Sequence, residues 1–303
     1  MSIQDVFFRV LFLVFVSIIG LLLGRKLKIN QKDLSSLLVY IISPAVMFVS
    51  VLEAPEGNNY FSFTLGALIV CSVISIVALF IGKLFWKDST SYLFAFSGGT
   101  GNTGYFGLPL AIGLFNDTGA AIAVFIILGV NLYEFSLGYF LTSRGAGTLK
   151  DSLGKIVRLP TIYAFLLALL VQYSDIPIND ATISSLNNFK GAYSILGMLI
   201  IGITLSHIRS FEIDWKYLSF SLIWKFIAWP IYGILLINFL PVEFSITERA
   251  IIMLMCSVPM AGNVVVIANE LDVHPEKAAT AVMLSTCLAL IMVPLSMAMV
   301  GVL

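Results

Sequence analysis

Charged residues are scarce in this sequence of 303 residues. Only 11% of them are Asp, Glu, Lys or Arg, whereas soluble domains contain about 25%. Hydrophobic residues make up 59%, and the mean hydropathy is +1.00. A surface this poor in charge is not adapted to water, and long apolar runs favour helices in lipid. The sequence therefore predicts an all-α polytopic membrane protein.

An excess of positive charge is also lacking, because 17 basic residues balance 17 acidic ones. This balance excludes a nucleic-acid partner. The three cysteines, Cys71, Cys256 and Cys287, lie in apolar runs without paired spacing, so they are predicted to be small apolar fillers. His207 and His274 have no second ligand at metal spacing and are read as loop histidines. With no constellation of nucleophile, base and metal, neither an enzyme nor a cofactor is expected.

Ten apolar runs approach the length of about 20 residues that a helix needs to cross a membrane. The first is too long for a signal-peptide core and has no cleavage site, so it is predicted to be retained. Pro160 and the polar stretch 179–185 leave nine spans as an alternative count. The predicted spans are Val6–Gly24, Leu34–Leu52, Phe63–Gly82, Tyr92–Phe115, Ala120–Leu141, Ile156–Tyr173, Leu186–Leu205, Tyr217–Leu240, Ala250–Ala268 and Ala278–Leu303.

Lysine and arginine fall on alternate loops of this arrangement. Such residues collect on the cytoplasmic side, so we expect both termini outside, in the plasma or inner membrane of the cell. Only Arg9, Lys190 and Arg249 lie on the opposite side. The basic residues on the predicted cytoplasmic loops are Arg25, Lys26, Lys28, Lys32, Lys83, Lys87, Arg144, Lys150, Lys155, Arg158, Arg209, Lys216 and Lys277.

The ten spans divide into two sets of five, and an odd number per set makes a duplication an inverted repeat. The predicted organisation is a first repeat at 1–142, a short cytoplasmic linker at 143–155 and a second repeat at 156–303. Gly101-Asn102 and Gly262-Asn263 each precede a similar run, at 119–124 and 277–282. Chance similarity between apolar segments is the alternative.

Two spans carry residues that interrupt helices. The fourth contains Gly98-Gly-Thr-Gly-Asn-Thr-Gly104 and then Pro109, and the ninth contains Pro259 with Gly262-Asn263. Each glycine weakens a helix by about 1 kcal/mol relative to alanine, and irregular backbone at membrane depth must line a cavity or be buried in protein. The breaks would aim two helix N-termini at the midplane, where they favour an anionic group. The alternative is that these glycines only permit close helix packing.

Two ionisable residues lie inside predicted spans, Glu134 in the fifth and Lys225 in the eighth. Ionised groups at this depth are costly and indicate function. Asn131 precedes Glu134 by three residues, which places both on one helical face. The three residues are therefore candidates for ion coupling. The alternative is a fixed ion pair between Glu134 and Lys225.

The segment Gly101-Asn-Thr-Gly-Tyr-Phe-Gly-Leu-Pro-Leu110 resembles the fourth-helix signature of the auxin efflux carrier family. The resemblance extends over nearly the whole chain, which looks like a compact bacterial-type member related to the plant auxin carriers. Plant carriers have proline where this chain has Gly101, and a long central loop that is absent here. Similar segments lie at Tyr40–Val46, Val258–Gly262, Val273–Pro275 and Thr280–Val282.

This resemblance implies ten helices in two inverted repeats, broken fourth and ninth helices that cross, and elevator-like export or exchange of organic anions, often by a homodimer. Asn102 matches the family's crossover asparagine and Pro259 its crossover proline. The predicted substrate-binding residues are Gly101, Asn102, Thr103, Tyr105, Gly262 and Asn263. The predicted crossover residues are Gly101, Pro109 and Pro259.

The leading hypothesis is a secondary transporter of small organic anions, such as carboxylates or auxin-like acids, coupled to a proton or sodium ion. One alternative is a sodium-coupled organic-anion symporter resembling the bile-acid carriers. Another is a membrane sensor that binds its ligand on a transporter-like fold. The expected partners are the anion, the coupling ion, membrane lipids and a second copy of the chain.

Overall fold

The computed structural model describes residues 2–27, 29–54, 60–143, 154, 157–174, 176–206 and 213–299. Every regular element within these ranges is a helix, as predicted. The first half contains α1 (Ile3–Lys26), α2 (Gln31–Leu37), η1 (Leu38–Ile42), α3 (Ser43–Leu52), α4 (Phe61–Phe85), α5 (Thr90–Gly98), η2 (Thr103–Gly107), α6 (Leu108–Tyr133), η3 (Glu134–Gly138) and α7 (Tyr139–Thr142). The second half contains α9 (Pro160–Tyr173), α10 (Asp180–Ser206), α11 (Trp215–Ile223), η4 (Trp224–Ala228), α12 (Trp229–Phe239), α13 (Ile246–Ser257), α14 (Asn263–Glu270) and α15 (Pro275–Met299).

Seven helical stretches of the described chain are long and apolar enough to cross a membrane. They correspond to predicted spans one, two, three, five, seven, eight and ten. Span six is represented by α9, which has only 14 residues. Most of the predicted linker lies outside the described residues. The seven stretches are Ile3–Lys26, Lys32–Leu52, Phe61–Phe85, Asp117–Thr142, Asp180–Ser206, Trp215–Phe239 and Pro275–Met299.

Predicted spans four and nine are interrupted, as the glycine and proline pattern indicated. Helix α5 ends at Gly98 and η2 begins only at Thr103. Helix α13 ends at Ser257 and α14 begins at Asn263. Pro259 explains the second end, because a residue before proline is pushed out of the helical region. Val258 accordingly has an extended backbone, with φ −60° and ψ 153°.

The predicted loop between spans four and five is helical instead, because α6 continues through residues 116–119. The helix bends sharply there. A Cβ atom added to Gly119 would lie 3.0 Å from the carbonyl oxygen of Ala111, eight residues earlier. Eight residues rise about 12 Å along a straight helix. The reversal of direction expected between the two spans therefore occurs within α6.

Three π-helical turns each end two residues before a proline. The element η1 precedes Pro44, η2 precedes Pro109 and η4 precedes Pro230. Proline lacks an N–H and its ring clashes with the carbonyl of the preceding turn, and a widened turn relieves both problems. The fourth π-helical turn, η3, has no proline after it and begins at Glu134.

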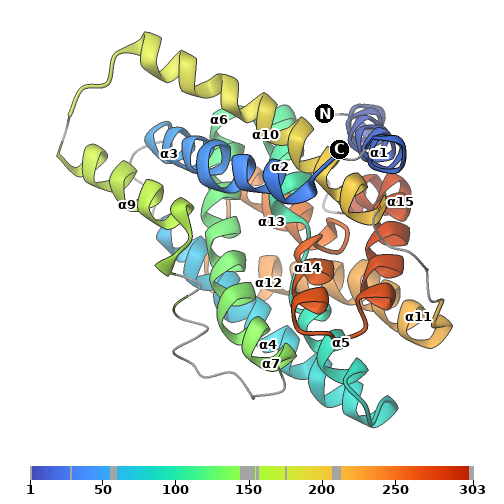
Figure 1. The fold of residues 1–303 in the computed structure, drawn as a ribbon. Coiled ribbons are helices and arrows are strands. Elements are labelled where there is room, and N and C mark those ends of the chain that lie inside the picture. Colours follow the sequence, from blue (N-terminus) through green and yellow to red (C-terminus); the bar gives the residue numbers. More distant parts are fainter. Residues whose placement is uncertain are drawn as a thin grey trace.

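The helices form two groups (Figure 1). Helix α1, the α2-η1-α3 segment, α9 and α10 form the first group, in which α1 packs along α10 and α3 along α9. Helices α4 to α7 and α11 to α15 form the second group. The first group meets the second mainly where α1 packs against α15, and also where α10 contacts η2 and α3 contacts α6.

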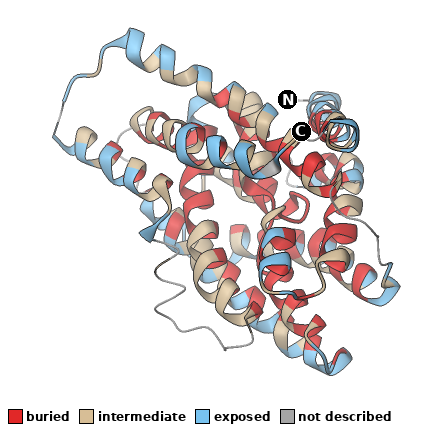
Figure 2. Ribbon diagram, in the orientation of Figure 1, coloured by how far each residue is buried: buried red, intermediate tan, exposed pale blue. Residues whose placement is uncertain are grey.

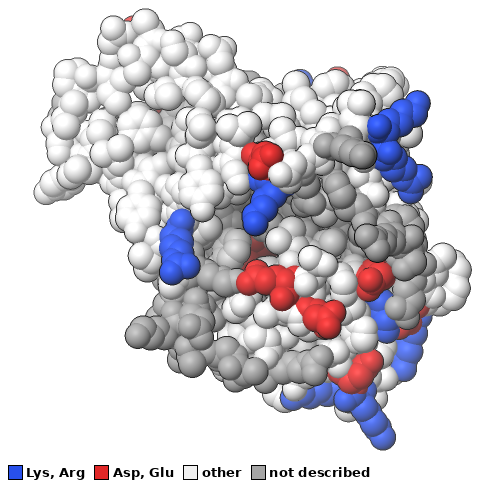
Figure 3. Space-filling model, in the orientation of Figure 1, with Lys and Arg blue, Asp and Glu red and all other residues white. Residues whose placement is uncertain are grey.

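The outer faces of both groups are apolar. Figure 2 shows exposed positions along the outward sides of the helices. The most exposed apolar side chains include Phe80, Leu84 and Tyr173, at 67%, 81% and 88%. The view in Figure 3 shows a broad uncharged area over α9, α3 and α10. Exposed aromatic and aliphatic side chains of this extent suit a lipid environment rather than water.

Candidate functional site

The two helix interruptions meet inside the molecule. The backbone N–H of Asn102 donates a hydrogen bond of 2.8 Å to the carbonyl oxygen of Pro259. Asn102 is also the residue from which η2 starts, because its carbonyl accepts from the N–H of Gly107 at 3.0 Å. This bond satisfies backbone that neither broken helix can pair by itself. Predicted crossover residue Pro259 thus contacts the other break directly.

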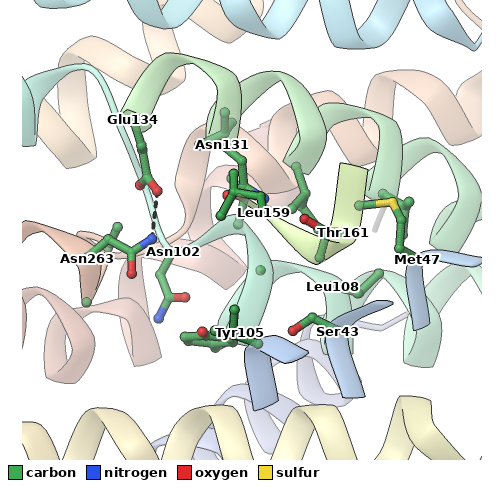
Figure 4. Close-up of a pocket in the computed structure, with 18 of the residues that line it drawn as sticks. Ser43, Met47, Asn102, Tyr105, Leu108, Asn131, Glu134, Leu159, Thr161 and Asn263 are labelled. Carbon is green, nitrogen blue, oxygen red and sulfur yellow. Dashed lines mark hydrogen bonds between the residues drawn. The ribbon is translucent and has the colours of Figure 1, made fainter. Parts of the chain in front are cut away.

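A cavity of about 160 Å³ lies beside this crossing, between the two groups of helices (Figure 4). The second group contributes both breaks and the middle of the α6-η3 helix. The first group contributes Ser43 and Met47 from α3, Thr161 from α9 and Tyr193 from α10. The predicted residues Gly101, Asn102, Thr103, Tyr105, Asn131, Glu134, Gly262 and Asn263 all line it.

The side-chain amide of Asn102 is a buried donor that is left unbonded. The residue is only 4% exposed, and its Nδ2 atom has no hydrogen-bond partner among the residues that the structure describes. Buried amide groups are almost always bonded, because an unsatisfied donor costs about 1–3 kcal/mol. In Figure 4 the Asn102 side chain projects from the crossing beside Tyr105. An acceptor atom of a ligand in the cavity would satisfy this donor.

Glu134 joins the two breaks through its carboxyl group. The hydroxyl of Thr100 donates to Oε1, and Nδ2 of Asn263 donates to Oε2 at 2.7 Å. Thr100 belongs to the first break and Asn263 begins α14 after the second. The side chain of Glu134 is buried, at 2% exposure. A change in the protonation of this acid would therefore act on both broken helices.

Lys225 does not pair with Glu134, so the predicted fixed ion pair is wrong for the described part of the chain. The Nζ atom of Lys225 lies 3.4 Å from the carbonyl oxygen of Thr100 and 4.5 Å from the ring centre of Trp229. Two indole N–H groups, of Trp224 and Trp229, donate to the carbonyl of Gly98 at 3.1 and 2.7 Å. These donors lie at the C-terminal end of α5, where a helix favours positive charge.

Gly101 lies against the side chain of Lys225. A Cβ atom on Gly101 would lie 2.4 Å from Nζ of Lys225 and 2.9 Å from a methyl group of Val258. Any larger residue would displace the ammonium group from the crossing. Glycine at position 101 therefore leaves room for the buried lysine.

Pro109 does not lie at the crossing. It is the second residue of α6, beyond η2, and does not line the cavity. Sequence reasoning missed Ser43, Thr161 and Tyr193, which come from the first group of helices, and Thr100, which lies within the glycine-rich run. Ser43 lies in the Tyr40–Val46 segment that carries the family resemblance, and this segment was the only signal in the sequence that could have identified it.

Ionic contacts lie at both ends of the helices. Lys190 on α10 bonds Glu53 at 2.7 Å and Asp117 at 3.2 Å. At the other end, Lys277 lies 3.0 Å from Asp214. Burial opposes the ionisation of Asp214, but the Tyr217 N–H and Lys277 outweigh it and hold the pKa of this carboxyl below its usual value.

The histidines and cysteines carry no metal site in the described chain. His274 lies 3.0 Å from the hydroxyl of Ser89 and 3.6 Å from Asp88, which agrees with its reading as a loop residue. His207 falls outside the described residues. Cys71 and Cys256 are buried as predicted, whereas Cys287 is exposed. No cluster of three metal-binding side chains occurs among the residues placed by the structure.

Comparison with known proteins gives consistent matches. The model of the family described as membrane transport protein matches residues 5–153 and 146–297. A protein of Methanocaldococcus jannaschii described as an uncharacterized transporter is 24% identical over 306 residues, covering 96% of this chain and 97% of that protein. Another uncharacterized transporter, from Methanothermobacter thermautotrophicus, is 29% identical over 198 residues, covering 64% of this chain and 63% of that protein.

Proposed function

This chain belongs to the membrane transport protein family, to which the auxin efflux carriers are assigned, and is a multi-pass membrane protein; on that premise we propose that it is a secondary carrier of small organic anions. The observation that carries the proposal is the unbonded Nδ2 of Asn102 beside a cavity at the crossing of two broken helices. An amide donor in this position suits a carboxylate oxygen of the substrate.

The electrostatics of the cavity favour one negative charge at a time. Glu134 is the single charged side chain among its described lining residues. The segments that start at Thr103 and Asn263 direct helix N-termini to this region, and each N-terminus carries about half a positive charge. These two partial charges balance one anion. They do not balance a substrate carboxylate together with an ionised Glu134.

We therefore assign the coupling ion as a proton and its carrier as Glu134. When Glu134 is protonated, its hydrogen bonds to Thr100 and Asn263 can rearrange, and the substrate supplies the negative charge. When Glu134 is ionised, it repels a carboxylate in the cavity. Substrate and proton thus bind together, and the coupling acts through Asn263 on one break and Thr100 on the other.

The proposed architecture is ten spans in two inverted five-helix repeats. The distribution of helices supports this architecture. In each half of the chain, the first helices belong to the first group and the later helices belong to the second group. The cavity lies between these groups, so an elevator-like movement of one past the other would carry the substrate across. We retain the expectation of outward termini in the cell membrane, and of a homodimer.

The size of the cavity distinguishes this proposal from a bile-acid type carrier. A cavity of about 150 Å³ holds a ligand the size of benzene, and this one, at about 160 Å³, is too small for a steroid. Small monocarboxylates fit. Transport that ignores a sodium gradient would reject the sodium-coupled alternative, and label exchange across the bilayer would reject a sensor that only binds.

The test is counterflow and proton-driven uptake of small carboxylates in proteoliposomes. Glu134→Gln keeps an acceptor for Asn263 and removes the exchangeable proton, so counterflow should persist while dependence on a pH gradient is lost. Asn102→Ala should weaken substrate binding by about tenfold, because it removes a charge-assisted hydrogen bond. Unaltered pH dependence in Glu134→Gln would reject the coupling role. Unaltered affinity in Asn102→Ala would remove this residue from the site.

A further inference from the structure

A second cavity, of about 220 Å³, lies behind the crossing and within the second group of helices. Gly101, Thr103 and Val130 line both cavities, but the remaining walls of this one come from α4, α6, η4, α12 and α13 and the chain after α12. Its mouth includes Leu240 and Val242, which are 45% and 55% exposed. Most of its lining is apolar, including Phe63, Val70, Ile126, Leu236, Ile252 and Met255.

Lys225 is the only charged residue among the described residues that line this cavity. It is 1% exposed and makes no ion pair within the described chain. An ammonium group has three donors, whereas this one has a single hydrogen bond, of 3.4 Å, to the carbonyl of Thr100. Burying a charge without a counter-ion is unfavourable, and an anion bound beside the ammonium group would offset this unfavourable free energy.

The combination of an apolar wall and one ammonium group selects an amphipathic anion. Since about 150 Å³ holds benzene, about 220 Å³ accommodates a monocarboxylate of roughly eight or nine heavy atoms. The apolar body would lie against the α4 and α13 side chains, and the carboxylate would face Lys225. A dicarboxylate would place its second charge in the apolar part without a partner.

We propose that the cavity behind the crossing is a binding site for a short-chain amphipathic monocarboxylate whose carboxylate is held by Lys225. This site is separate from the transport cavity and does not depend on the proposed function. A carboxylate bound there competes with the Thr100 carbonyl for the ammonium group. The ligand therefore acts on the backbone of the first break from the side opposite to Glu134.

Gly66 supplies a variant that blocks this cavity without disturbing the fold. It is the sixth residue of α4 and lines the cavity, and a Cβ atom there would meet no heavy atom within 4 Å. Gly66→Leu therefore adds a side chain into open space and improves the helix propensity of α4. Gly66→Ala is its matched control, because one methyl group leaves most of the volume.

The experiment measures binding of radiolabelled hexanoate to the purified full-length protein in detergent. We expect saturable binding that Lys225→Met and Gly66→Leu each weaken by about tenfold or more, because they remove the charge or the space. Gly66→Ala should bind within about twofold of the original protein, and the neutral analogue hexanamide should compete poorly. Thermal unfolding checks that every variant is folded.

Several results would overturn the proposal. Absence of saturable binding to the original protein is one such result. Another is that Asn102→Ala abolishes binding and Gly66→Leu retains it, because this would place hexanoate in the transport cavity. Equal competition by hexanamide would show that no anion is recognised. If Lys225→Met does not fold, the proposal is still tested by comparing Gly66→Leu with Gly66→Ala and by the competition with hexanamide.

Discussion

At the scale of single residues, Thr100 is the point where the two buried ionisable groups meet. Its hydroxyl donates to Glu134, and its carbonyl accepts from Lys225. The acid and the base therefore act on one residue of the first break from its two sides, without an ion pair between them. The proposed coupling role of Glu134 requires this arrangement, because an ion pair with Lys225 would oppose its protonation.

Gly101→Ala tests the fit between the first break and Lys225. Its Cβ atom would lie 2.4 Å from Nζ, so the lysine must leave the Thr100 carbonyl and the Trp229 ring. We expect the free energy of unfolding to fall by about 1–2 kcal/mol, measured by thermal unfolding in detergent. The same change in a Lys225→Ala background should cost much less. An equal loss of unfolding free energy in both backgrounds would contradict a close contact between Gly101 and Lys225.

Asp214→Asn tests the ion pair with Lys277 through its pH dependence. Because the pKa of Asp214 is lowered in the fold, its carboxylate stabilises the protein above the ordinary value of about 4, and that contribution is lost as the pH falls through the lowered value. Asparagine still caps the Tyr217 N–H. The variant should be less stable by about 1 kcal/mol at pH 7, and the difference should shrink as the pH falls below about 4. A difference that is constant with pH would refute this account.

At the scale of elements, the breaks and π-helical turns accommodate prolines and glycines within membrane-spanning helices. The two breaks bond each other at the crossing, and η1, η2 and η4 each widen the helix before a proline. Pro294 lies inside α15 without such a turn. The turn at Glu134 has no proline to explain it, and π-helical turns of this kind are frequent at functional sites.

The contact between α1 and α10 depends on glycines that permit close approach. A Cβ atom on Gly202 would lie 1.9 Å from the carbonyl oxygen of Ser17, and one on Gly20 would lie 2.3 Å from that of Leu199. Gly202→Ala should therefore separate the helices and lower the free energy of unfolding by about 1–3 kcal/mol. The measurement is thermal unfolding in detergent.

Gly191→Ala, on the same helix, is the matched control. A Cβ atom at Gly191 meets nothing within 4 Å, so alanine should raise stability by up to about 1 kcal/mol through its higher helix propensity. Similar losses in both variants would mean that α10 tolerates no alanine for reasons other than its contact with α1.

At the scale of the whole molecule, Lys190 links the two groups of helices at one end. Lys190 and Glu53 belong to the first group, and Asp117 belongs to the second. Glu53 lies six residues beyond Met47 of α3, so it is about 9 Å along the helix from the nearest α3 residue that lines the transport cavity. The bond to Asp117 therefore favours closure of the cavity toward this end.

Asp117→Asn should weaken this closure and leave the Lys190–Glu53 pair in place. The side chain of Asp117 is 63% exposed, so the effect should be about twofold to fivefold. The measurement is the rate at which a membrane-impermeant thiol reagent, added from the Lys190 end, labels Ser43→Cys in a Cys287→Ser background. Glu53→Gln is the control, because it cuts a contact within one group. Equal rates in Asp117→Asn and the parent would rule out a link between the groups.

The sequence by itself determined the membrane location, the helical class, most spans and the positions of both breaks. These features depend on local composition: apolar length, glycine density at 98–104 and the proline at 259. Asn102, Asn263 and Glu134 could be predicted as site residues from the sequence. Burying amides and an acid within membrane-spanning helices is energetically unfavourable, so such residues indicate a function.

Only the tertiary structure decided which of these residues meet. Asn102 bonds Pro259 and Glu134 bonds Asn263 across more than a hundred residues of sequence, and neither spacing nor symmetry specifies such contacts. Lys225 is a further example, because it contacts Thr100 and Trp229 instead of forming the alternative ion pair with Glu134. The bend within α6 is also a feature of the tertiary structure. The physical reason is that packing of side chains from distant helices, rather than local propensity, chooses among several partners that satisfy a buried charge.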